Sequence, residues 1–123
     1  MKFLSSDYTT TIEEIVSVVS SNDIGPGGFG DPGSSAKWRD LDANDCREQV
    51  ERCRAWIRTQ DQTKTIRPGI WSEDYMRTVE RHANYRIHKG AFLAAAYLEG
   101  VNVRRHGSDA NFNIRINRHR NIL

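Results

Sequence analysis

The chain has few cysteines and prolines, no long apolar run and almost no excess of either charge. Its 123 residues include two cysteines, three prolines and a formal net charge of +2. The longest apolar run, residues 91–98, is far shorter than the roughly 20 residues that span a bilayer. Residues Met1–Ser6 lead into acidic and polar residues, without the apolar stretch of a secretory signal. We therefore expect a cytoplasmic protein that neither enters a membrane nor is exported.

Cysteine, histidine and serine do not form a recognisable reactive pattern. Cys46 and Cys53 are two turns apart on a predicted helix, so their Cα atoms are separated by roughly 10 Å, beyond disulfide reach. Burial in an apolar stripe raises the pKa of a thiol, which makes both cysteines poor nucleophiles. The four histidines are scattered and offer no closely spaced pair of zinc ligands. We expect no metal, no cofactor and no catalytic residue, and hence a protein that is not an enzyme.

Length and composition favour one small folded domain. A hydrophobic share of 37% and a charged share of 28% are ordinary for a globular chain of this size. We divide it into an amino-terminal helix within residues 1–21, a flexible Gly/Pro loop over residues 22–36 and a helical core with a basic β-hairpin and tail over residues 37–123. The loop composition indicates no regular secondary structure, and its glycines do not match a phosphate-binding motif.

Two amphipathic patterns predict helices. The first covers residues 9–20, where Thr10 or Thr11 with Glu13 or Glu14 can form a capping box. The second covers residues 42–60 and is the clearest in the chain. Its apolar stripe consists of Cys46, Val50, Cys53 and Ile57. Its opposite side is charged, and we interpret it as a solvent-facing surface with helical ion pairs such as Glu48–Arg52.

Two helices and a hairpin follow in residues 72–116. Ser72 is a suitable cap for a helix that ends near Asn84. Residues 90–99 are apolar all round and stop at Gly100, which indicates a buried helix packed on the helix of residues 46–57 and on the hairpin. Residues 101–105 and 112–116 alternate in character around a loop over 106–111, as a hairpin does. We predict an α+β fold: three to four core helices with a carboxyl-terminal hairpin, similar to a winged helix-turn-helix.

The basic residues are concentrated near the carboxyl end. Residues 1–69 carry nine Lys and Arg against eleven Asp and Glu, whereas residues 70–123 carry nine against five. Such asymmetry favours a polyanion or an acidic partner surface, although a solvated basic tail is equally common. The candidate binding residues are the cations beside the apolar helix, on the hairpin and in the tail: Arg86, Lys89, Arg104, Arg105, Arg115, Arg118 and Arg120.

Two family resemblances are carried by this half of the chain. The segments 85–90, 98–100 and 103–107 resemble the winged-helix domain of gluconate-repressor-type regulators, which implies a second helix in the DNA major groove and a wing on the backbone. The second helix here departs from that pattern, because apolar residues replace those that would read bases. Residues 89–100 and 109–114 are similar to small proteins of phages and bacterial mobile elements. That likeness implies an accessory role without an assigned activity.

Two functional hypotheses lead at this point, and a third, an enzyme, would need a pocket that gathers His82, His88 or His106 with a carboxylate. The first is a non-catalytic accessory protein that binds nucleic acid, or a nucleic-acid-associated complex, through the basic hairpin and tail. Such binding should weaken steeply with salt. The second is a protein-binding inhibitor or adaptor, such as a phage anti-defence protein that blocks a host complex.

Overall fold

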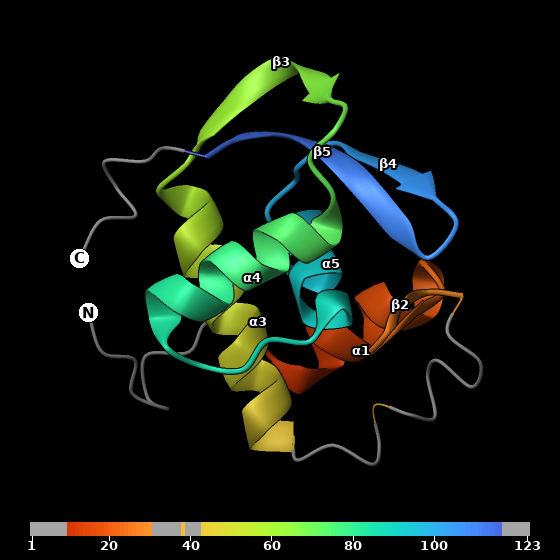
Figure 1. Cartoon of the computed structure of the whole chain (residues 1–123). Coiled ribbons are helices and arrows are strands. Elements are labelled where there is room, and N and C mark those ends of the chain that lie inside the picture. Colours follow the sequence, from red (N-terminus) through yellow and green to blue (C-terminus); the bar gives the residue numbers. More distant parts are fainter. Residues whose placement is uncertain (1–9, 31–37, 39–42, 117–123) are drawn as a thin grey trace.

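The computed structural model describes residues 10–30, 38 and 43–116, and in these residues it has four helices and two small antiparallel sheets (Figure 1). The helices are α1 (Ile12–Ser21), α3 (Ala43–Arg58), α4 (Ser72–Ala83) and α5 (Lys89–Leu98). The strands are β1 (Ile24–Gly25), β2 (Gly28–Phe29), β3 (Asp61–Arg67), β4 (Val103–His106) and β5 (Asp109–Arg115). The predicted α+β class is confirmed. None of the described helices has the length and apolar content needed to cross a bilayer.

The amino-terminal helix begins as its sequence indicates. The Thr11 hydroxyl accepts the Glu14 amide at 3.1 Å, and the Glu14 carboxylate accepts the Thr11 amide at 2.9 Å. This reciprocal pair is a capping box and satisfies two amide groups that the helix leaves open. Ile15 and Val19 are buried one turn apart, so α1 joins the core through its apolar face.

Helix α3 confirms the predicted apolar stripe, whereas the interpretation of its charged side needs correction. The four residues of the stripe are buried, and Arg52 pairs with Glu48 at 2.6 Å. Glu51, however, is only 2% exposed, and its carboxylate accepts the Thr10 amide at 2.6 Å. Arg47 donates to the Thr10 carbonyl at 3.2 Å. Part of the charged side therefore holds the start of α1 instead of facing solvent.

The expectation that residues 22–36 contain no regular structure is wrong for residues 24–29. Strands β1 and β2 pair there as a short antiparallel hairpin, Ile24 opposite Phe29 and Gly25 opposite Gly28. Ile24 and Phe29 are 0% and 3% exposed, so apolar burial stabilises a segment whose composition alone disfavours a strand. Residues 31–36 of the predicted loop lie outside the described part of the chain.

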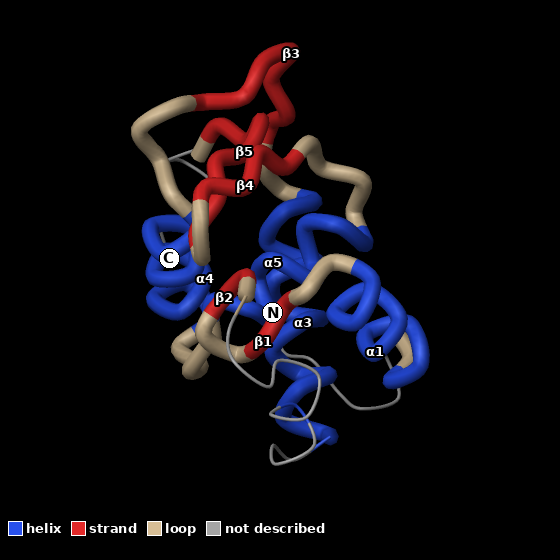
Figure 2. The backbone as a smooth tube through the Cα atoms, turned by 90° about the vertical axis from the view of Figure 1, so that its right-hand side faces the viewer, coloured by secondary structure: helices blue, strands red, loops and turns tan. Residues whose placement is uncertain are grey.

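The larger sheet contains a strand that the sequence did not indicate. Strand β3 follows α3 and pairs with β5, which also pairs with β4, so the order is β3-β5-β4 (Figure 2). The register shifts between Gln62, opposite Ile114, and Arg67, opposite Phe112. Asn113 bridges this irregularity by donating to the Thr63 carbonyl at 2.9 Å. The sheet lies on one side of the helices.

The predicted hairpin is present, but its loop is shorter than expected. Strand β4 extends to His106 and β5 begins at Asp109, so only Gly107 and Ser108 form the turn. Gly107 has a φ of +61°, a left-handed conformation that glycine adopts without a steric cost. The interpretation of residues 106–111 as loop is therefore wrong for all but these two.

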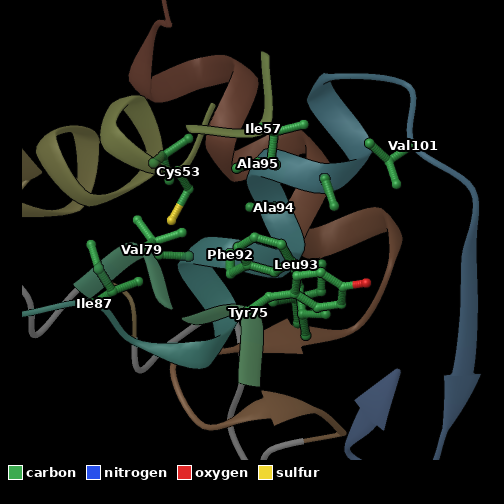
Figure 3. Packing of buried hydrophobic residues seen from close by; sticks show 14 of the residues in the cluster. Cys53, Ile57, Tyr75, Val79, Ile87, Phe92, Leu93, Ala94, Ala95 and Val101 are labelled. Carbon is green, nitrogen blue, oxygen red and sulfur yellow. The ribbon is translucent and has the colours of Figure 1, made fainter. Parts of the chain in front are cut away.

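Helix α5 is the centre of the core, as its apolar sequence predicts. Residues Gly90–Ala96 are all buried. Figure 3 shows Phe92 and Leu93 among side chains from the neighbouring helices, including Cys53 and Ile57 of α3 and Tyr75 and Val79 of α4. The Phe92 ring stacks on Tyr75 at 5.4 Å and meets Phe112 of β5 edge-on at 5.2 Å. One helix thus links the sheet to the other helices.

Candidate functional site

The β4–β5 hairpin has an inner face, which includes Arg105, Ala110, Phe112 and Ile114, and an outer face, which includes Arg104, His106, Asp109 and Asn111. Side chains alternate between the two faces along each strand. Arg104 lies opposite Asn111, and Arg105 lies opposite Ala110. The apolar residues of the inner face are fully buried against the helices. The adjacent arginines Arg104 and Arg105 therefore occupy different environments.

Asp109 holds the turn end of the hairpin against the body of the protein. Its Oδ1 accepts the amides of Ser72 and Ala110, both at 2.8 Å, and the Ser72 hydroxyl. Its Oδ2 lies 3.8 Å from Lys89 Nζ at the start of α5. Ser72 was expected to cap α4, but it is the first helical residue and Trp71 occupies the cap position. The Ser72 hydroxyl instead binds the hairpin.

The inner face and turn of the hairpin also contact the amino-terminal hairpin β1–β2. The Phe29 amide donates to the Ser108 carbonyl at 3.1 Å, and Figure 1 shows the turn of β4–β5 next to β2. The Arg105 guanidinium lies 4.7 Å from the centre of the Phe29 ring and 3.6 Å from the Asp23 carboxylate. The charge of Arg105 is therefore offset in part by Asp23 of the same chain.

The outer face carries an exposed aromatic group and an arginine without a partner in the described part of the chain. The Trp71 ring meets the His106 ring edge-on at 5.3 Å, and Trp71 is 38% exposed. Arg104 is two residues before His106 on the same face of β4. Arg104 is exposed and has no ion pair or side-chain hydrogen bond within residues 10–30, 38 and 43–116. We call Trp71, Arg104 and His106 the outer-face triad.

The other predicted cations do not gather at this site. Lys89 pairs with Asp109, and Arg115, at the far end of β5, pairs with Asp61 at 3.1 Å. Arg86 is exposed on the α4–α5 connection. Its neighbour Tyr85 binds Asp45 of α3, so this part of the connection runs beside α3. Arg118 and Arg120 lie outside the described residues.

Sequence reasoning missed Trp71 and His106. Trp71 precedes the helix start and His106 was assigned to a loop, so neither belonged to a periodic pattern. One local signal was present, because Trp71 is an aromatic residue directly before the helix start at Ser72. The contact between Trp71 and His106 joins residues 35 positions apart, so no local pattern predicts it. Only the pairing of β4 with β5 and the binding of Ser72 by Asp109 bring the two rings together.

The start of α5 is closed by the amino-terminal hairpin. The Gly90 amide donates to the Pro26 carbonyl at 3.1 Å. A Cβ atom at Gly90 would overlap the Gly25 carbonyl and approach the Trp38 ring, so only glycine permits this close approach. Because α1 also packs against α5, the helix that would read DNA bases in a winged domain is covered on this side.

The two thiols have the properties of core residues. Burial raises the pKa of Cys46 to about 11, with a further contribution from the nearby Asp45 carboxylate. Complete burial raises the pKa of Cys53 still further. Thiols of this kind stay protonated at neutral pH and are weak nucleophiles. In the described residues no three His, Cys, Asp or Glu side chains lie close enough to hold a metal ion.

The chain matches no protein-family model, no curated protein and no solved structure.

Proposed function

We propose that this protein is a non-catalytic accessory protein, of the kind carried by phages and mobile elements, that binds nucleic acid through the outer face of its carboxyl-terminal hairpin. The observation that carries the proposal is the outer-face triad. It places a guanidinium that has no partner among the described residues on the same face as the His106 ring, which in turn meets the exposed Trp71 ring. Arginine binds phosphate oxygens, and aromatic rings beside it favour nucleic acid over a simple anion.

The order of the elements supports a winged-helix arrangement as part of this proposal. From α3 onward the chain runs helix, strand, helix, helix, strand, strand, and the first strand joins the hairpin in the order β3-β5-β4. The hairpin then corresponds to the wing. The buried α5 argues against major-groove reading, so we assign binding to the phosphate backbone and expect little sequence preference. The tail residues Arg118 and Arg120 belong to the proposal as additional cations.

Arg104→Ala tests the proposal against a matched variant. Arg81→Ala makes the same change in net charge at the far end of α4, where Arg81 is exposed. We expect the wild type to bind a fluorescein-labelled oligonucleotide at low salt, and Arg104→Ala to weaken that binding and lower the salt slope by about 1. Arg81→Ala should leave both unchanged. The measurement is fluorescence anisotropy over a salt series.

Two results of this experiment would overturn the proposal. The first is no binding of any nucleic acid at low salt. The second is an equal loss for Arg104→Ala and Arg81→Ala, because binding would then depend on net charge and not on the outer face.

The competing function is a protein-binding inhibitor or adaptor, for example one that blocks a host defence complex. It is favoured by the pairing of Lys89, Arg105 and Arg115 with acids of the same chain, which reduces the charge available for phosphate. An exposed tryptophan is also frequent at the centre of protein interfaces. Gentle purification with nuclease treatment separates the two functions. A stoichiometric protein partner that survives nuclease and is released by Trp71→Ala would favour the adaptor.

A further inference from the structure

Trp71 is an exposed side chain on a firmly held backbone. Only Val16 and Trp71 are large exposed hydrophobic residues in the described part of the chain. The Trp71 amide donates to the Asp74 carboxylate at 2.9 Å. On either side of it, the Ile70 carbonyl accepts from Asn111 at 2.9 Å and the Ser72 amide donates to Asp109 at 2.8 Å. The backbone that carries the ring is therefore held on both sides, and the ring itself contacts His106.

The acidic groups around Trp71 are engaged with other groups. Glu73 pairs with Arg77 at 3.2 Å, and Asp74 accepts the Trp71 amide. Asp109 is directed toward Ser72 and Lys89. His106 contacts the ring, and Arg104 lies two residues before His106 on the same face of β4. Glu73 and Asp109 are thus paired with cations of the same chain, whereas Asp74 accepts an amide and pairs with no cation among the described residues. Two of the three acids near the ring are therefore offset before a phosphate binds at Arg104 and His106.

The same fold makes duplex reading difficult. A helix that enters the major groove must project from the protein, but α5 is buried and its start is covered by Pro26. The turn of the β4–β5 hairpin is held by Ser72, Lys89 and Phe29. Paired bases lie inside a duplex, where a ring on a protein surface cannot reach their flat faces. Unpaired bases offer those faces directly.

We infer that the nucleic acid bound at the outer face is single-stranded, with one unpaired base stacked on Trp71 beside His106 and an adjacent phosphate on Arg104. The inference rests on the proposed function and adds its ligand class. Stacking on an aromatic ring tolerates any base, since every base has a flat π-face. This agrees with the burial of α5, the helix that would read bases in a winged domain.

The test compares a labelled oligothymidylate, an oligouridylate and a DNA duplex of equal length by anisotropy. The single strands should bind more tightly than the duplex. Trp71→Ala should weaken single-strand binding about tenfold, because stacking on one ring contributes about 1–3 kcal/mol per base. Trp71→Phe should keep most of the affinity. Val16→Ala, which removes the other exposed apolar side chain, should change nothing, and thermal melting checks that each variant folds.

Tryptophan fluorescence gives a second readout that needs no destabilising variant. Trp38 and Trp56 are 8% and 2% exposed, so a bound base should quench mainly Trp71. We expect quenching of the wild type by saturating oligothymidylate and its loss in Trp71→Phe. Affinity that is equal for duplex and single strands, together with unchanged binding by Trp71→Ala, overturns this inference but leaves the proposed function standing if Arg104→Ala still weakens binding. No binding by any probe overturns both.

Discussion

The arginines at the end of α3 and Arg104 of β4 differ in the partners that they bind, although α3 and β4 both have a strongly charged sequence. On α3, Arg54 and Arg58 converge on Glu99 at the end of α5, at 2.6 and 2.8 Å. Arg54 also donates to the Thr10 hydroxyl at 2.7 Å. On β4, Arg104 has no such partner among the described residues. The first group connects α1, α3 and α5, whereas Arg104 is available for a ligand.

The comparison shows that the number of positive charges in a segment does not measure its binding capacity. The hairpin and its surroundings supply four predicted cations within the described residues: Lys89, Arg104, Arg105 and Arg115. Three of them pair with Asp109, Asp23 and Asp61. The surface that remains is smaller than the sequence indicates, and it includes an aromatic ring that the charge count did not include.

The largest expected loss of stability follows from removing the Asp109 carboxylate, which holds the hairpin. Asp109→Ala removes the acceptor for two amides and the ion-pair partner of Lys89. We expect a loss of about 3 kcal/mol in the free energy of unfolding, because buried amide groups lose their hydrogen bonds and a cation its partner. Urea denaturation measures it. Glu73→Ala removes an exposed acid one residue from Ser72 and should cost less than about 1 kcal/mol.

A smaller loss of stability is expected when the Glu99 carboxylate is replaced. Partial burial opposes its ionisation, but hydrogen bonds from Arg58 and Arg54 outweigh this and lower its pKa. A lowered pKa stabilises the fold above the ordinary pKa of a glutamate, near 4.3, and this contribution is lost as the pH falls through the folded-state value. Glu99→Gln should therefore cost about 2 kcal/mol at neutral pH.

The pH dependence separates this effect from a simple packing defect. The difference between wild type and Glu99→Gln should shrink as the pH falls through the lowered pKa of the Glu99 carboxyl, because the wild-type carboxyl then becomes protonated as well. Denaturant melts over a pH series give the comparison, with the exposed Glu13→Gln as control. A difference that stays constant with pH would show that the ion pairs contribute nothing.

The smallest expected change in stability is the difference between alanine variants of the adjacent arginines Arg104 and Arg105 of β4. Arg105→Ala removes the contact with Phe29 and the pair with Asp23, and it should cost about 0.5–1 kcal/mol of stability. Arg104→Ala should change stability by less than about 0.5 kcal/mol. Thermal melting of the two variants measures this. Equal destabilisation by both would contradict the assignment of Arg104 to the exposed outer face.

Periodicity predicted the helices well because their apolar residues meet one common core. The stripe of α3, the capping pair of α1 and the left-handed end of α4 at Asn84 are all local features, and each is present. Strand β3 was missed because six of its seven residues are polar, so its sequence does not alternate between apolar and polar residues. Its pairing with β5 supplies the hydrogen bonds that its own sequence does not predict.

The candidate site was predicted only in part, for a similar reason. The position of Arg104 on a hairpin strand follows from alternation, and so does its separation from Arg105. The pairing of Arg105 with Asp23 joins residues from opposite ends of the chain. The contact between Trp71 and His106 also depends on long-range pairing. Such contacts leave no periodic signal in the sequence.

The sequence by itself determined the α+β class, the four helices, the buried character of α5 and the presence of a basic hairpin, because each follows from local patterns of apolar, capping and turn residues. Tertiary structure decided which cations are neutralised, which aromatic ring stays exposed and which helix face is covered. Those outcomes depend on partners that come together only when distant segments pack, and they limit the candidate surface to Trp71, Arg104 and His106.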